Sequence, residues 1–362
     1  MTRRTLDIRV FDVTKGDCIL IQFPNRKVGV VDCAQSESGF LPPSLRWLQD
    51  RGIKEVEFVC LTHPHVDHLA GMHRYFAGHG IRVKQFWHTA PDVYMLMSKC
   101  NDRSTIRGLP ELRRHWAERR KAIIEVFRAA YEYARSSGMR VRRVGAKSDQ
   151  LASIGGVTIT ALAPSEQNVE KFQRQVCADF DAGLSGSEKR VFNLASAILL
   201  LEWKSYKVIL GGDAPRRACK QLISWTETEA ARQDLAAEWQ LVKVAHHAAS
   251  DCFFPGMWEQ VLISGPAVLV VSSDGIRHPS QAFFQSCRTH DRVYCTRRPA
   301  ACISGSLHSH AEIVCRYGSR RAFAATRLCS ADITVRIDES GETEVQTALN
   351  GPYPRCHKVG CQ

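Results

Sequence analysis

Four residues with metal-binding side chains lie within six positions of one another: His63, His65, Asp67 and His68, in the pattern H-x-H-x-D-H. Imidazole nitrogens and carboxylate oxygens suit zinc, manganese or iron, and a cluster without cysteine is typical of a catalytic zinc site rather than a structural one. A chance gathering of histidines in a polar loop is the alternative, and the spacing makes it the weaker interpretation. The pattern therefore predicts a catalytic metal site at residues 63–68.

The residues on either side indicate how the backbone presents these ligands. The apolar run Val56-Glu57-Phe58-Val59-Cys60-Leu61 predicts a buried strand, and the segment from Leu69 to about Gly80 predicts a helix. The ligands would then lie on a strand-to-helix loop, where a rigid scaffold presents several side chains to one point.

The remaining periodicity alternates between strands and helices, which indicates a layered α/β fold. Ahead of the metal motif we expect strands within residues 6–33 and a helix over 42–52; after it come strands at 81–88, 157–163, 194–203, 207–210, 241–245, 267–272, 332–338 and 343–347. A single domain over residues 1–350 accounts for this order, with a helical insertion at about 92–150 and a tail at 351–362.

The insertion is strongly basic. The chain has a net charge of +12, and residues 99–147 hold fourteen Lys or Arg against five Asp or Glu. A helix is predicted from Pro110 to Gly138, with apolar residues at helical spacing on one face and cations on the other. An ordinary solvated face is the alternative to polyanion binding, and the low acidic content keeps both open. The candidate nucleic-acid-binding residues are Arg113, Arg114, Arg119, Arg120, Lys121 and Arg128.

Composition limits the cellular setting. No apolar run reaches the roughly 18 residues that a membrane helix needs, and charges interrupt the N-terminus where a signal peptide would be apolar. The fourteen cysteines include no C-x-x-C pair, and Cys18, Cys33 and Cys60 sit in apolar strand patterns typical of reduced core residues. We expect a cytoplasmic protein without membrane contact; the sequence does not indicate its protein partners.

The motifs together resemble the metallo-β-lactamase superfamily, and within it the soluble hydrolase domain of bacterial competence (DNA-uptake) channel proteins. The likeness extends over roughly residues 6–295. Besides H-x-H-x-D-H it is carried by the segments 11–21 (FDVTKGDCILI), 30–34 (VVDCA), 208–213 (VILGGD), 242–247 (VKVAHH) and 275–279 (GIRHP). The resemblance implies an αββα sandwich and a site with two divalent metal ions, Zn²⁺ or Mn²⁺.

The resemblance also implies a role for each ligand. His63 and His65 would hold the first metal, and Asp213 would bridge both metals, although a helix N-cap before Pro215 is the local alternative for Asp213. The second metal would be held by Asp67, His68 and His246. Most of the superfamily supplies a third histidine to the first metal; here Asn193 stands at that place, with His88 as a possible substitute.

The expected function follows from two adjacent metals, which would activate a water as hydroxide and clamp a phosphate. His247 and His278 are candidates for phosphate contact or protonation of the leaving group, although His247 could instead only brace His246. With Asp67 and Asp213 they form the expected catalytic set. We expect a phosphodiesterase or nuclease acting on nucleic acid, with DNA favoured by the resemblance alone. The alternatives are a hydrolase of a small ester, lactone or cyclic nucleotide, and a nucleic-acid-binding regulatory subunit with a weak metal site.

Overall fold

The computed structural model describes residues 3–35, 41–89, 110–145, 150–172, 192–218, 238–250, 267–274, 276–280, 292–297 and 331–349, together with the single residues 174, 220, 252, 282, 283 and 287. Side chains are described in these ranges except at 110–120, 238, 331, 348 and 349. The expected C-terminal tail at 351–362 and parts of the expected insertion, at 92–109 and 146–149, lie outside the described residues.

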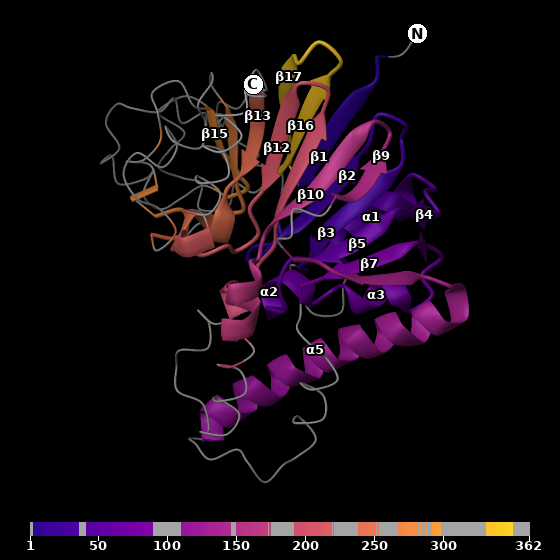
Figure 1. Cartoon of the computed structure of the whole chain (residues 1–362), viewed down its shortest axis with the longest axis vertical. Coiled ribbons are helices and arrows are strands. Elements are labelled where there is room, and N and C mark those ends of the chain that lie inside the picture. Colours follow the sequence, from indigo (N-terminus) through magenta and orange to yellow (C-terminus); the bar gives the residue numbers. More distant parts are fainter. Residues whose placement is uncertain are drawn as a thin grey trace, which may run out of the picture.

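Two facing sheets form the body of the molecule (Figure 1). In the described chain, the first has eight strands, in the order β17 (Thr343–Leu349), β16 (Ala331–Asp338), β1 (Thr5–Val10), β2 (Cys18–Gln22), β3 (Val28–Cys33), β5 (Phe58–Leu61), β7 (Gln85–His88) and β8 (Arg140–Arg143). The second has seven, in the order β15 (Arg292–Cys295), β14 (Val268–Val271), β13 (Glu238–Lys243), β12 (Tyr206–Leu210), β11 (Ile198–Trp203), β10 (Val157–Ala163) and β9 (Gln150–Ile154). A small parallel pair, β4 (Glu55–Val56) and β6 (Arg82–Val83), directly precedes β5 and β7 and continues their pairing in the same register.

Alternating side chains build the core between the sheets. Leu6, Ile8 and Val10 of β1 point to the same buried cluster as Val157 and Ile159 of β10. Successive side chains in a strand point to opposite faces, so each strand gives every second residue to this core. The hydrophobic burial holds the two sheets together, and the αββα sandwich is confirmed.

Helices cover the outer face of the first sheet. They are α1 (Pro43–Asp50), α2 (Val66–Leu69), α3 (His73–Phe76) and the long α5 (Pro110–Ser137) (Figure 1). Phe127 of α5 and Phe76 of α3 pack against Phe86 of β7, with ring centroids 5.7 and 5.2 Å away. This aromatic cluster fixes α5 beside α2 and α3, the helices that follow the metal motif.

The segment expected as an insertion is also part of the sheets. The predicted helix is confirmed, and it ends before Gly138, which has a φ of 71°. The chain then runs into β8, which pairs in parallel with β7 at the edge of the first sheet. After the undescribed residues 146–149, β9 forms the edge of the second sheet.

The helix predicted from Leu69 to Gly80 is wrong in its extent. The structure has two one-turn helices instead, and the first begins at Val66, inside the metal motif. The break follows from a tertiary contact, because the Gly71 N–H donates to the Cys33 carbonyl oxygen at 2.8 Å instead of continuing the helical ladder.

Parallel strands decide where the site lies. In the first sheet β3, β5 and β7 run parallel, and in the second β12, β13 and β14 do. Ligands in open α/β sheets bind beyond the carboxyl ends of such strands. The segments with candidate ligands follow the carboxyl ends of β5, β12, β13 and β14.

Candidate metal centre

The H-x-H-x-D-H segment is held by a buried carboxylate at the end of β3. Asp32 accepts the Thr62 N–H at 2.8 Å and the Thr62 hydroxyl at 2.6 Å, and its Oδ2 lies 2.7 Å from Nδ1 of His68. Asp32 has a φ of 55° and is fully buried. It therefore fixes both the start of the motif and the orientation of the His68 ring.

The four residues of the motif converge as predicted, although they are not all on a loop. His63 is buried in the loop, His65 caps the start of α2, and Asp67 and His68 lie within α2. Nε2 of His63 lies 2.8 Å from Nδ1 of His65.

Asp213 follows β12 through a tight turn. Gly212 has a φ of 50°, and a Cβ there would lie 2.6 Å from the Ser196 hydroxyl oxygen, so the close approach requires glycine. The Asp213 N–H donates to that hydroxyl at 2.8 Å. The contact directs the Asp213 carboxylate into the centre of the histidine cluster.

The two oxygens of Asp213 face different histidines. Oδ1 lies 3.3 Å from Nε2 of His68 and 3.4 Å from Nε2 of His247. Oδ2 lies 3.8 Å from Nε2 of His63 and 4.0 Å from Nε2 of His246. The carboxylate therefore stands between two groups of candidate ligands, as a bridging residue must.

This geometry differs from the expected roles of the adjacent histidines. His247, in place of His246, groups with Asp67 and His68, with one ligand atom of each residue within 4.8 Å of the others. His246 lies instead on the Oδ2 side, and its Nε2 is 3.2 Å from the Asn193 amide nitrogen. His246 therefore stands where the first metal lacks its third histidine.

The exchange of roles between His246 and His247 results from the backbone conformation after β13. His246, His247 and Ala248 have φ values of 49°, 52° and 62°, three successive left-handed residues without glycine. Such conformations cost roughly 1–2 kcal/mol per residue, so the surrounding packing must impose them. The turn gives the two rings separate partners: Nδ1 of His247 donates to the Ser272 carbonyl oxygen at 3.1 Å, and Nδ1 of His246 lies 3.2 Å from the Cys252 sulfur.

The arrangement of hydrogen-bond donors and acceptors fits a cation. Because Nδ1 of His247 donates to a carbonyl and Nδ1 of His68 to Asp32, both Nε2 atoms carry lone pairs in the neutral rings. These two nitrogens and Asp213 Oδ1 are buried and face one another. Such a group is unfavourable unless a positive charge lies among its members, either a proton on His68 or a metal ion. The residues therefore fit a divalent metal.

The pKa values of the acids and of His63 favour metal-binding protonation states. Burial opposes ionisation of Asp213, but His247, His68 and His63 hold its pKa well below the usual range. Burial likewise opposes ionisation of Asp67, yet His68 and His65 lower its pKa to about 2. Burial, with His68 and His65, lowers the pKa of His63, which keeps the ring neutral and leaves one of its nitrogens with a free lone pair.

His68 behaves differently before a metal binds. Burial lowers its pKa, but the carboxylates of Asp213 and Asp32 outweigh this and raise the pKa well above its usual value. A proton and a metal ion therefore compete for the same nitrogen of His68.

His278 lies at the margin of the cluster. Its ring centroid is 6.3 Å from that of His246 and 6.2 Å from that of His247. Oδ1 of Asp274 accepts the backbone N–H of His278 at 2.9 Å and those of its two predecessors, which holds the loop. Burial lowers the pKa of His278, so the neutral ring is the main form at neutral pH.

His88 does not join the candidate ligands. Its ring packs against Phe86 and Phe127, with centroids 5.4 and 5.1 Å away. The ligand clusters found among the described residues do not include it. Between the two suggested substitutes for the missing histidine, only Asn193 borders the site.

The basic helix α5 packs against one of the helices of this site. Lys121 and Arg128 have exposed side chains, and α5 contacts α2, which carries Asp67 and His68. The side chains of the other four, Arg113, Arg114, Arg119 and Arg120, lie outside the described part. Nucleic-acid binding by this helix stays a prediction.

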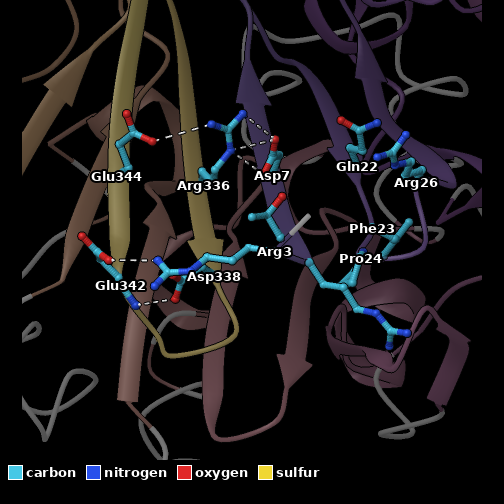
Figure 2. A pocket seen from close by; sticks show the side chains of 12 residues that line it. Arg3, Asp7, Gln22, Phe23, Pro24, Arg26, Arg336, Asp338, Glu342 and Glu344 are labelled. Atoms are coloured by element: carbon cyan, nitrogen blue, oxygen red, sulfur yellow. Dashed lines mark hydrogen bonds and ion pairs between the residues drawn. The ribbon is translucent and has the colours of Figure 1, made fainter. Parts of the chain in front are cut away.

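A separate pocket of about 660 Å³ lies at the opposite end of β1 from the site (Figure 2). Figure 2 shows that its charges face one another: Arg336 pairs with Asp7 and Glu344, and Arg3 pairs with Asp338 and Glu342. Because these arginines are already neutralised, the pocket is a poor candidate for the chemistry of the histidine cluster.

Sequence reasoning assigned no role to three of the supporting residues. Asp32, Ser196 and Ser272 orient Asp213 and two of the histidines, yet Asp32 and Ser196 are single polar residues beside apolar runs, and Ser272 acts through its backbone carbonyl, which any residue type would supply. The Asp that ends the strand at Val30-Val31-Asp32 was the one local signal.

Comparison with known proteins gives a family likeness over part of the chain. The family model of the metallo-beta-lactamase superfamily matches residues 12–99. None of the curated proteins matches the chain. None of the helices among the described residues is long and apolar enough to span a bilayer.

Three solved structures resemble the fold at low similarity. One is a new diphosphatase from the PhnP family, with 11% sequence identity and a TM-score of 0.35; the match covers 86% of this chain and 94% of that one. Another is the CmlA beta-hydroxylase E377D mutant: 12% identity, TM-score 0.38, 78% of this chain and 48% of that one. A third is the metallo-beta-lactamase fold protein YhfI from Bacillus subtilis: 10% identity, TM-score 0.39, 82% of this chain and 98% of that one. TM-scores below 0.5 are too low to carry a conclusion about this chain.

The likeness to competence proteins is not tested by these comparisons and stays a prediction. Over residues 12–99, which include the H-x-H-x-D-H cluster, the chain is similar to the metallo-beta-lactamase superfamily, and its αββα sandwich has that fold.

Proposed function

We propose that this chain is a metal-dependent phosphodiesterase that cleaves nucleic acid with two divalent ions, Zn²⁺ or Mn²⁺. The observation that carries the proposal is the convergence of Asp213 Oδ1 with the bare Nε2 atoms of His68 and His247. A buried set of acceptors from metal-binding residues is costly for a protein that never binds a cation there. DNA is preferred over RNA only on the resemblance to competence proteins.

Two groups of residues would hold the two ions, one on each side of Asp213. His63, His65 and His246 would hold the first, on the Oδ2 side, and Asp67, His68 and His247 would hold the second, on the Oδ1 side. Two such ions lower the pKa of a shared water and offset charge on a phosphate under attack.

The chain's own groups keep these ligands in position. Asp32 and the Ser272 carbonyl each accept a hydrogen bond from the Nδ1–H of a ring, so Nε2 of His68 and of His247 is directed inward, where it can bind a metal. The Ser196 hydroxyl holds the backbone of Asp213. At the margin, the ring of His278, whose centroid lies 6.2 Å from that of His247, can donate an N–H hydrogen bond to an oxygen of the diester.

The position of α5 supports nucleic acid over a small molecule. The helix α5 contacts α2, which carries Asp67 and His68, and has the exposed cations Lys121 and Arg128; a polymer bound at the metals could extend its flanking phosphates along this helix. A small ester or lactone would not interact with these cations, because the whole molecule would fit within the metal cluster.

The test is incubation of purified protein of defined metal content with labelled single- and double-stranded DNA and RNA, and in parallel with bis-p-nitrophenyl phosphate. We expect metal-dependent cleavage of a polymer, and no cleavage by Asp213→Asn. Cleavage of the small diester without any polymer cleavage would favour the small-substrate alternative. Polymer binding without cleavage of either, at full metal loading, would favour a regulatory binding protein.

A further inference from the structure

The loop between β1 and β2 directs one lysine at the metal cluster. Nζ of Lys15 lies 3.5 Å from Oδ2 of Asp67, and the lysine side chain is 67% exposed while that of Asp67 is 23% exposed. The ammonium group therefore stands at the open side of the proposed second metal position, in contact with solvent and with one of its ligands.

The backbone under Lys15 is closely packed against α2. Gly16 has a φ of 102°, and a Cβ there would lie only 1.7 Å from the Asp67 carbonyl oxygen. The next residue, Asp17, donates its N–H to that same oxygen at 3.2 Å. Its carboxylate is fully buried and pairs with the buried Lys243 of β13, in the second sheet. The loop is therefore fixed to both halves of the site.

The other side of the loop is fixed as well. Arg297 donates to Asp12 Oδ1 and to the Thr14 hydroxyl, both at 2.7 Å. Asp12 Oδ1 also accepts the Thr14 N–H at 3.0 Å, and Thr14 has a φ of 66°. These contacts position the Cα of Lys15, so that only its own side chain is free to move.

We propose that Lys15 binds a phosphate oxygen of the substrate next to the second metal position and so selects an anionic phosphoryl group over a neutral ester. This rests on the proposed function. A mobile ammonium on a rigid loop, within reach of Asp67, can turn from that carboxylate to an oxygen of a bound anion.

The experiment measures binding of inorganic phosphate to the full, metal-loaded chain by isothermal titration calorimetry. Lys15→Gln removes the charge and keeps a polar side chain, Lys15→Arg keeps the charge, and Lys54→Gln is the matched control, an exposed lysine between α1 and β4. We expect Lys15→Gln to weaken phosphate binding about tenfold, or about 1.4 kcal/mol, with unchanged metal content. Lys15→Arg should recover part of the affinity, and Lys54→Gln should bind as wild type does.

Kinetics supply a second readout. Lys15→Gln should raise the KM for bis-p-nitrophenyl phosphate more than it lowers kcat, and should leave any hydrolysis of neutral p-nitrophenyl acetate unchanged. Equal phosphate affinity in wild type and Lys15→Gln, or no phosphate binding by the loaded wild type, would overturn the proposal. Loss of metal from Lys15→Gln would also overturn it, because the lysine would then serve Asp67 alone. The calorimetric result stands whether or not any diester is hydrolysed, so it separates this proposal from the proposed function.

Discussion

Replacing Asp32 with Asn changes a single charge in the centre of the fold without changing the shape of the side chain. Asp32 accepts three hydrogen bonds, two from Thr62 and one from His68, at 2.8, 2.6 and 2.7 Å. An Asn that keeps the backbone bond to Thr62 must place its NH₂ group toward His68. Nδ1 of His68 then becomes an acceptor, and its proton moves to Nε2, 3.3 Å from Asp213 Oδ1.

The expected loss of metal affinity follows from this change of tautomer. The lone pair that would bind the second metal is lost, whereas the first-metal group is linked to Asp32 less directly, through the Thr62 hydroxyl that donates to Asp32 and lies 3.2 Å from Nδ1 of His63. Loss of such an outer-shell carboxylate typically lowers metal affinity 10- to 100-fold, about 1.4–2.7 kcal/mol. Because Asp32 is fully buried and no water can replace it, we expect the upper end of this range at one of two sites.

The assay is equilibrium dialysis of metal-stripped protein against Zn²⁺ or Co²⁺, followed by elemental analysis. Asp32→Asn should bind one equivalent with nearly wild-type affinity and the second about 100-fold more weakly. Asp338→Asn is the matched control, a carboxylate of 6% exposure in the pocket at the far end of β1. Two equivalents bound by Asp32→Asn with wild-type affinities would refute the reasoning about His68.

Three further predictions follow from the site and from α5. Asp213→Asn should lower metal binding at both positions and abolish hydrolysis, with an unchanged circular dichroism spectrum; wild-type activity would show that Asp213 does not bridge. Replacing Arg113, Arg114, Arg119 and Arg120 together with Gln should weaken polymer binding most at low salt and reduce the salt slope by about 0.7–0.9 for each lost phosphate contact, with hydrolysis of bis-p-nitrophenyl phosphate unchanged. An identical salt slope in this variant would mean that the helix face is only solvated. In metal-stripped protein, the raised pKa of His68 contributes stability that is fully present below its unfolded pKa of about 6.5 and is lost as pH rises through the folded value. The Tm should therefore fall as the pH rises through the folded pKa of His68, and a Tm that rises instead would contradict a protonated His68.

Periodicity and turn residues predicted much of the local structure. The helix from Pro110 and its end before Gly138 were predicted, because apolar residues such as Ile123 and Phe127 recur at helical spacing, and both are in its buried face. The hairpin of β16 and β17 followed from alternating apolar residues around Ser340-Gly341. The helix after the metal motif was predicted too long, because the bond from Gly71 to Cys33 joins residues far apart in sequence.

The sequence by itself determined which residues can bind a metal, since the four candidate ligands from His63 to His68 lie within six consecutive residues. Only the tertiary structure decided how they divide around Asp213. His246 and His247 are neighbours, and sequence alone favours ordinary backbone angles for both. Packing after β13 instead holds them and Ala248 at positive φ, which directs one ring to each oxygen of Asp213. Asp32, Ser272 and Lys15 reach the site in the same way, from strands and loops that are distant in the chain and adjacent only after the two sheets pack.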